Sequence, residues 1–187
     1  RALRGILDWQ WQFAPQACVT AAIATSVGCS LQGDVPQTQV CALAAQLAEA
    51  KVAEITLADT VGYANPRQVK RLFQAVATEV GDVPLAAHFH DTRGMGLTNV
   101  LAALDCDIFK FDAALAGLGG CPFAPGASGN IATEDTVYML ETMGLRTSID
   151  LDALLRLRED FARWLPEEPL QGRLGIAGIA RNFTPAA

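Results

Sequence analysis

The sequence predicts an α/β fold in which parallel strands are joined by helices. Short apolar or β-branched runs alternate with longer helical segments four times, the strand segments are apolar almost throughout, and two helical segments begin with proline. Such alternation implies parallel strands connected by right-handed crossovers. Near-continuous apolar strands are typical of a sheet that is buried on both faces.

Each element follows from its local pattern. Four short runs bounded by turn residues are predicted as strands: residues 19–26, 54–58, 85–90 and 108–112. Four segments of helical character follow them: residues 36–50, 66–80, 95–104 and 134–143. Pro36 and Pro66 are expected in the first turn of their helices, where the missing proline N–H is no loss. Residues 1–18 are expected to form a partial helix that leads into the first strand.

The composition indicates a single soluble domain. Hydrophobic residues make up 51% of the 187 residues and charged residues 18%, which supplies a core and argues against disorder. We divide this domain into a lead-in (residues 1–18), four βα units (19–145) and a C-terminal helix and tail (146–187). No run could span a bilayer and no secretory leader is recognisable, so we expect a cytoplasmic protein. The net charge of −6 argues against a nucleic-acid partner, and five cysteines without a C-x-x-C pattern indicate reduced thiols.

The strongest functional feature is the pair His88 and His90, at the end of the third predicted strand. They are the only histidines in the chain. Alternate residues of a strand point to the same face, so both imidazoles are expected to aim at one point. Parallel α/β sheets place their chemistry at the carboxyl ends of strands, which makes this pair a candidate metal site. The alternative is a half-exposed strand with two titratable side chains and no ligand.

A long glycine-rich loop follows the fourth predicted strand. Residues 117–130 contain five glycines and two prolines, a content that excludes regular structure and is typical of a shaped functional loop. The loop lacks the Gly-Lys-Ser/Thr ending of a phosphate-binding P-loop. It carries one thiol, Cys121, and ends at Asn130. Cys121 is a candidate nucleophile or acid/base, with an inert structural thiol as the alternative.

Acidic residues at the element ends have two interpretations. Asp59 follows the second predicted strand and is expected either to orient a ligand or a histidine, or to cap the turn. Asp91 lies off the histidine face and is expected to be structural. Residues 133–135, Thr-Glu-Asp, are expected to cap the next helix and to complement its dipole.

Two architectures accommodate four βα units. A flavodoxin-like open sheet would be complete at this length, whereas a (β/α)8 barrel typically needs about 250 residues. The length favours the open sheet and the motifs favour the barrel. The first residue, Arg1, and the partial helix after it suggest the carboxyl-terminal half of a longer protein.

Three segments together resemble the 3-hydroxy-3-methylglutaryl-CoA lyase family, a group of metal-dependent lyases and Claisen-type synthases. They are residues 54–62, 88–94 and, above all, 117–135, whose cysteine loop ends in Ala-Ser-Gly-Asn. The resemblance extends over residues 22–155, with a looser match at 177–183. It implies a (β/α)8 TIM barrel, of which this chain carries strands five to eight and the C-terminal helices.

The resemblance also implies a set of site residues. His88, His90 and Asn130 would bind Mg²⁺ or Mn²⁺, and Cys121, His88 and Asp59 would be the catalytic residues. The substrate would be an acyl-CoA, 3-hydroxy-3-methylglutaryl-CoA, which would be cleaved to acetyl-CoA and acetoacetate. This is a reaction of leucine degradation and ketone-body metabolism. The resemblance further implies a homodimer, with a mitochondrial matrix location in a eukaryote.

The chain departs from the family pattern in three places, of which the first is residues 1–18, a segment that matches poorly. The first barrel strand of the family carries an arginine and a metal-binding aspartate that have no counterpart here. Residues 28–33, Gly-Cys-Ser-Leu-Gln-Gly, replace the usual Gly-Cys-Pro-aromatic-Glu-Gly. Two alternatives therefore stay open: a non-catalytic half-barrel that needs a partner, and a Claisen-type acyl-CoA synthase. The loop thiol and the absence of a Gly-Glu-Arg loop argue against the synthase.

Overall fold

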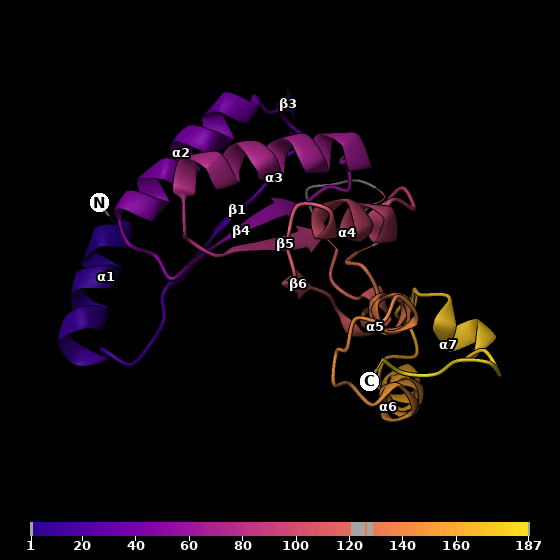
Figure 1. Ribbon diagram of the computed structural model, residues 1–187. Helices are drawn as coiled ribbons and strands as arrows, with labels where there is room; N and C mark the ends of the chain where they lie inside the picture. The colour runs from indigo at the N-terminus through magenta and orange to yellow at the C-terminus, as the bar shows by residue number, and fades with distance from the viewer. Residues whose placement is uncertain (1, 121–125, 127–128, 187) are drawn as a thin grey trace.

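The computed structural model describes residues 2–120, 126 and 129–186. Figure 1 shows a parallel sheet with helices packed on one face and a second group of helices beyond its far edge. In chain order the strands and helices are α1(Ala2–Phe13), β1(Thr20–Ile23), β2(Gly28–Cys29), β3(Gly33–Asp34), α2(Gln37–Glu49), β4(Glu54–Asp59), α3(Pro66–Val80), β5(Leu85–Phe89), α4(Gly96–Leu104), β6(Phe111–Asp112), the short 3-10 helix η1(Leu115–Gly117), α5(Thr133–Thr142), α6(Leu151–Trp164) and α7(Leu174–Ala177).

The sheet has the order β1-β4-β5-β6, and each neighbouring pair is parallel. Helices α2, α3 and α4 cover one face of it (Figure 1). The predicted α/β fold with four βα units is confirmed. The bounds of α3 agree with the prediction, while β1 and β6 are shorter than predicted. A two-stranded antiparallel hairpin, β2-β3, was not predicted from the sequence.

The helix starts follow two different patterns. Asn65 caps α3 in a reciprocal capping box with Gln68, and Pro66 is the first helical residue, as predicted. Pro36 does not occupy the first turn of α2. It is the residue before the helix, with an extended ψ of 128° and no side-chain cap. Proline fits there because the residue at this position keeps a non-helical conformation.

The core lies between the sheet and its helices. Ile55 and Leu57 of β4 and Phe89 of β5 are almost fully buried, and Phe89 packs edge-on against Phe73 of α3 with ring centroids 6.5 Å apart. The prediction of strands buried on both faces is correct for most of β4 and β5 but wrong for the sheet edges. Thr20 and other residues of β1 and β6 are exposed, because within the described chain no further strand or helix covers their outer side.

The C-terminal helices form a second, smaller packing unit. Val137, Leu151 and Leu174 make its buried centre, and the ring of Phe183 stacks on Tyr138 with centroids 5.3 Å apart. Across the residues that the structure describes, no helix is both long and apolar enough to cross a bilayer.

Glu141 fastens the C-terminal tail and should make the stability acid-sensitive. Its Oε1 accepts hydrogen bonds from the N–H and the hydroxyl of Thr147, and its Oε2 accepts one from Ala186 N at 2.7 Å. The Thr147 hydroxyl, followed by the two backbone N–H groups, lowers the pKa of Glu141. This stabilisation is therefore complete above the unfolded pKa of about 4.3 and is lost as the pH falls through the lower folded pKa.

We expect the melting temperature of Glu141→Gln to fall less steeply than that of the wild type as the pH is lowered. Glutamine still offers one oxygen acceptor but does not titrate. The measurement is thermal unfolding of wild type and variant between pH 7 and pH 3, with Glu159→Gln on the exposed face of α6 as the control. An equal fall of the melting temperature with pH in the wild type and in Glu141→Gln would contradict the role assigned to Glu141.

Candidate metal and active site

Two imidazoles meet at the carboxyl end of β5. The alternation of the strand places His88 and His90 on one face, and their ring centroids lie 5.2 Å apart at an interplanar angle of 46°. His90 is buried, at 6% exposure, and His88 is half-buried. The structure therefore brings the predicted pair together at one point of the sheet.

Asn130 lies beside this pair through backbone pairing. It forms an isolated antiparallel bridge with His90, flanked by hydrogen bonds from Asp91 N to Gly129 O and from Ile131 N to Phe89 O. A side chain at position 129, where φ is +102°, would meet the carbonyl oxygen of Gly117 at 2.2 Å. Glycine is thus required for the end of the loop to pass this close to Gly117 at its start.

The amide of Asn130 has a fixed orientation. Its Nδ2 donates to the carbonyl oxygens of Leu118, at 2.6 Å, and Gly119, at 3.2 Å. The reverse orientation would set an oxygen against two carbonyl oxygens. The Oδ1 atom is consequently left free, and it is buried without a hydrogen-bond partner.

Two buried polar atoms in this site lack hydrogen-bond partners. They are Asn130 Oδ1 and His90 Nδ1. A buried polar atom without a partner is costly, so such atoms call for a ligand or a functional reason. Burial lowers the pKa of His90, and the charge of His88 acts in the same direction. A neutral imidazole and an amide oxygen are both suitable ligands for a divalent cation.

In the described part of the chain, the donors brought together here are His88, His90 and Asn130. Among the residues that the structure describes, no group of three or more His, Cys, Asp or Glu side chains could hold a metal ion. Two imidazoles and one amide oxygen would leave positions open for substrate oxygens and further ligands.

Asp112 of β6 is a neighbour of His88 that the sequence interpretation did not single out. The register pairs the two residues, and Asp112 Oδ2 lies 3.5 Å from His88 Nδ1. A carboxylate beside Nδ1 favours the tautomer that is protonated there and leaves Nε2 with its lone pair. The position of Asp112 on the next predicted strand after the histidines is the sequence feature that could have indicated it. The contact itself is known only from the register of the two strands.

Asp59 has the contacts of a turn cap. It is 1% exposed, and its two carboxylate oxygens accept hydrogen bonds from Tyr63 N at 2.8 Å and Ala64 N at 3.0 Å. Burial raises the pKa of Asp59, although these two backbone N–H groups oppose the shift. The turn-capping interpretation thus describes what the side chain does in the structure. Its predicted catalytic role stays a prediction.

Two other predicted residues have different outcomes. Cys121 lies outside the described residues, and its role stays a prediction. Asp91 accepts a hydrogen bond from Gly96 N at 2.6 Å, at the start of α4, as expected of a structural residue.

The prediction for residues 133–135 is wrong for the cap, although Glu134 and Asp135 do lie in the first turn of α5, where acids complement the helix dipole. The residue before α5 is Ala132, and no side chain caps the helix. Glu134 is fully buried, with its Oε2 accepting a hydrogen bond from Ala116 N, and Asp135 accepts from Arg173 N and Leu174 N. Both carboxylates are occupied by tertiary contacts, which the local pattern of a cap does not reveal.

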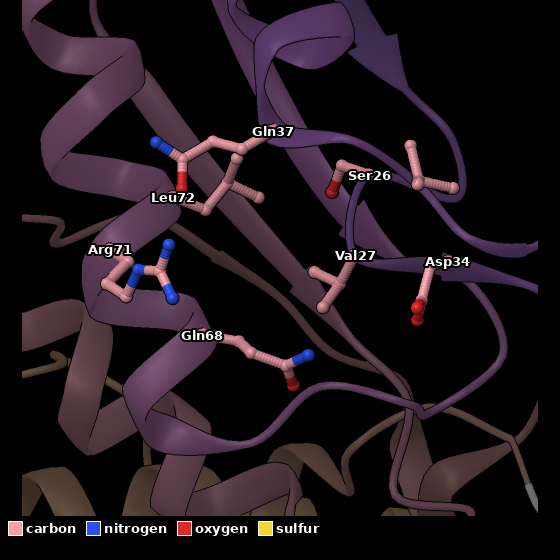
Figure 2. Close-up of a pocket in the computed structure, with 8 residues that line it drawn as sticks. Ser26, Val27, Asp34, Gln37, Gln68, Arg71 and Leu72 are labelled. Atoms are coloured by element: carbon pink, nitrogen blue, oxygen red, sulfur yellow. The ribbon is translucent and has the colours of Figure 1, made fainter.

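A pocket of about 260 Å³ lies beside the start of α2, past the carboxyl end of β1. Figure 2 shows Gln68 and Arg71 of α3 on one side of it, facing Ser26, Val27 and Asp34 on the other. Arg71 provides a cation and Asp34 an anion at its rim. This pocket has polar walls but contains none of the predicted site residues.

Comparison with known proteins assigns these features to one family. The HMGL-like family model matches residues 13–161. The chain is 45% identical over 156 residues to a hydroxymethylglutaryl-CoA lyase of Bacillus subtilis, a match covering 82% of this chain and 51% of that protein. It is 42% identical over 157 residues to an (R)-citramalyl-CoA lyase of Chloroflexus aurantiacus, covering 84% and 49%.

A solved structure gives the same result. An HMG-CoA lyase of Acinetobacter baumannii, in complex with coenzyme A and 3-methylmalate, superposes with a TM-score of 0.86 at 44% identity. The match covers 97% of this chain and 59% of that chain. The chain thus spans about half the length of the curated relatives it matches. The predicted barrel-type α/β fold is confirmed over the part that this chain covers.

Proposed function

Because the chain belongs to the HMGL-like family, we propose that it carries part of the active site of a carbon–carbon lyase. The proposed reaction cleaves 3-hydroxy-3-methylglutaryl-CoA to acetyl-CoA and acetoacetate. The observation that carries this proposal is the pair of unpartnered buried atoms, His90 Nδ1 and Asn130 Oδ1, beside His88. A site that leaves lone pairs free in a buried place is suited to a cation and the substrate oxygens bound to it.

We assign His88, His90 and Asn130 as the residues that would hold Mg²⁺ or Mn²⁺. Mixed nitrogen and oxygen ligands with open positions suit these ions better than a closed zinc site. When bound, the ion would supply Lewis acidity to the substrate oxygens.

The chain's own residues would then move the protons. Cleavage of the C2–C3 bond requires that the 3-hydroxyl lose its proton, and the bond electrons pass to C2 as the enolate of acetyl-CoA. Acetoacetate leaves with the new ketone, and a proton must be delivered to C2. His88, whose Nδ1 lies beside the carboxylate of Asp112, and Cys121 are the candidates for these transfers. Asp59 would hold the turn beside them.

The relatives favour one second candidate. The Chloroflexus aurantiacus protein is named for (R)-citramalyl-CoA, another 3-hydroxyacyl thioester, whose cleavage yields pyruvate in place of acetoacetate. The two substrates differ in the chain that becomes the second product, so the same bond-breaking groups would serve both. With acetoacetate as product, the reaction belongs to leucine degradation and ketone-body metabolism. We assign the protein to the cytoplasm, or to the mitochondrial matrix of a eukaryote, as a homodimer.

The experiment that tests this function uses the chain combined with the amino-terminal half of a homologous lyase. Acetoacetate and pyruvate are measured from the two thioesters, with Mg²⁺ or Mn²⁺ and after chelation. Metal-dependent release of acetoacetate supports the proposal, and pyruvate alone supports the second candidate. If neither product forms but the reverse condensation does, the protein is a Claisen-type synthase.

Replacing Cys121 with alanine should lower the turnover of this active pair by a factor of at least about 10², the effect of a lost proton-transfer group. Metal binding should remain intact because a loop thiol assists proton transfer without coordinating. Turnover and Mn²⁺ binding are measured on the same preparation, with Cys106→Ala as the control. An unchanged turnover would make Cys121 a bystander.

A further inference from the structure

A closed ring of polar contacts includes Ala116, which immediately precedes the glycine-rich segment 117–130. Ala116 N donates to Glu134 Oε2 at 3.0 Å, and Glu134 Oε1 lies 2.9 Å from Arg158 Nε, without hydrogen-bond alignment. Arg158 donates through its terminal nitrogen to Gln171 O at 2.7 Å, and Gln171 N donates back to Ala116 O at 2.8 Å. The ring joins η1, α5, α6 and the segment before α7.

The two charges of the ring are enclosed by protein. Glu134 is 0% exposed and Arg158 8%. The backbone packs directly on the guanidinium, since a Cβ at Gly175 would lie 1.9 Å from Arg158 Nε. Apolar residues often replace a buried ion pair without loss of stability, so the pair is poorly explained by stability alone. The position of the backbone segment that this ion pair holds is the better explanation for its presence.

The ring holds a strained turn. Ala116 is fully buried with φ at +55°, in the left-handed region that alanine seldom adopts, and Gly117 follows with φ at +65°. Both backbone groups of Ala116 are bound by the ring. Strained residues persist where the surrounding contacts over-determine them, often next to functional sites.

This turn determines where the amide of Asn130 is anchored. The next two residues, Leu118 and Gly119, provide the carbonyl oxygens that accept from Asn130 Nδ2. If the turn at Ala116 relaxed, these acceptors would move and the amide could rotate. The oxygen left free for a ligand thus depends on the ring.

We propose that Glu134 and Arg158 are positioning residues that hold the turn at 116–117 and thereby keep Asn130 Oδ1 free to bind a cation. The assignment of Asn130 as a ligand rests on the proposed function. The key contact is the acceptor that Glu134 offers to Ala116 N, because it fixes the strained residue directly.

The test compares two double variants in the chain paired with the amino-terminal half of a homologous lyase, the form in which the proposed metal site is complete. Glu134→Gln with Arg158→Met removes both charges but keeps an oxygen acceptor for Ala116 N, whereas Glu134→Leu with Arg158→Met removes the acceptor as well. Both variants avoid leaving a lone buried charge. Val137→Ala, in the same small core, controls for a general loss of stability. The readouts are amide hydrogen exchange of residues 114–119 by mass spectrometry and Mn²⁺ affinity by electron paramagnetic resonance.

We expect the leucine variant to exchange these amides at least about 10-fold faster than the glutamine variant, since local opening sets the exchange rate. Its Mn²⁺ affinity should fall by about 10- to 100-fold, the usual cost of losing an outer partner of a metal ligand. The glutamine variant and Val137→Ala should retain wild-type values for both. Equal exchange in the two double variants, or equal Mn²⁺ affinity despite unequal exchange, would overturn the positioning role. If the wild type binds no Mn²⁺, the proposed function fails, and the exchange comparison alone decides whether the ring holds the turn.

Discussion

Replacing His90 with alanine is expected to abolish metal-dependent thioester cleavage. His90 is the more deeply buried of the two histidines and has a ring nitrogen with no protein partner. Losing an outer partner of a ligand costs about 10- to 100-fold in metal affinity, and loss of a direct ligand should cost more. The measurements are Mn²⁺ binding and acetoacetate release by the chain paired with the amino-terminal half of a homologous lyase.

The stability of the metal-free protein separates a ligand from a structural histidine. A buried nitrogen without a hydrogen bond costs roughly 1–3 kcal/mol, which offsets the packing lost on truncation to alanine. The melting temperature of metal-free His90→Ala should therefore stay near that of the wild type, while added Mn²⁺ should raise only the wild-type value. A large fall in the metal-free melting temperature would identify His90 as a structural residue. Cys121→Ala gives the matched contrast, since it should keep the Mn²⁺-dependent rise.

Much of the fold was predictable because its signals are local. The capping box at Asn65 and the apolar period of α3 determine that helix within its own residues. The hairpin β2-β3 was missed because each strand has only two residues, too few for an alternating pattern. The exposed edge strands were predicted as buried because an apolar run has the same appearance in the middle of a sheet and at its edge.

The candidate site was predictable where spacing alone determines geometry. Two residues of separation along a strand place His88 and His90 on one face, whatever the rest of the chain does. Asp112 required the register of the next strand. The ring formed by Glu134 and Arg158 required two helices and a loop to meet, and its glutamate has the local appearance of a helix-cap acid.

The described sheet has two unpaired edges, and helix α1 has exposed apolar side chains. Strands β1 and β6 each lack a neighbour on one side within the described chain. Helix α1 lies at one side of the molecule in Figure 1, and although Leu3 packs against the core, none of the residues of the helix is buried. Trp9, Trp11 and Phe13 are 59%, 80% and 62% exposed. Exposed strand edges and apolar side chains of this kind favour association with other chains.

The 187-residue chain alone is therefore expected to associate and to lack lyase activity. Its described part supplies two imidazoles and one amide oxygen but no carboxylate ligand, and it spans about half of its curated relatives. A closed barrel leaves no strand edge, so the missing strands should both cover β1 and complete the site. We expect light scattering to give at least twice the chain mass of 19.8 kDa, and no acetoacetate release with Mg²⁺.

Addition of the amino-terminal half of a homologous lyase should convert the associated chain into a one-to-one complex that releases acetoacetate. Ala22→Lys, which places a charge on the exposed face of the edge strand β1, should weaken both self-association and complementation, because both use this edge. Gln39→Lys on the exposed surface of α2 adds the same charge away from the edge and should change neither. A monomeric chain with substantial activity of its own would show that the catalytic groups lie within these 187 residues. Self-association that Ala22→Lys leaves unchanged would instead point to the exposed aromatic side chains of α1 as the contact.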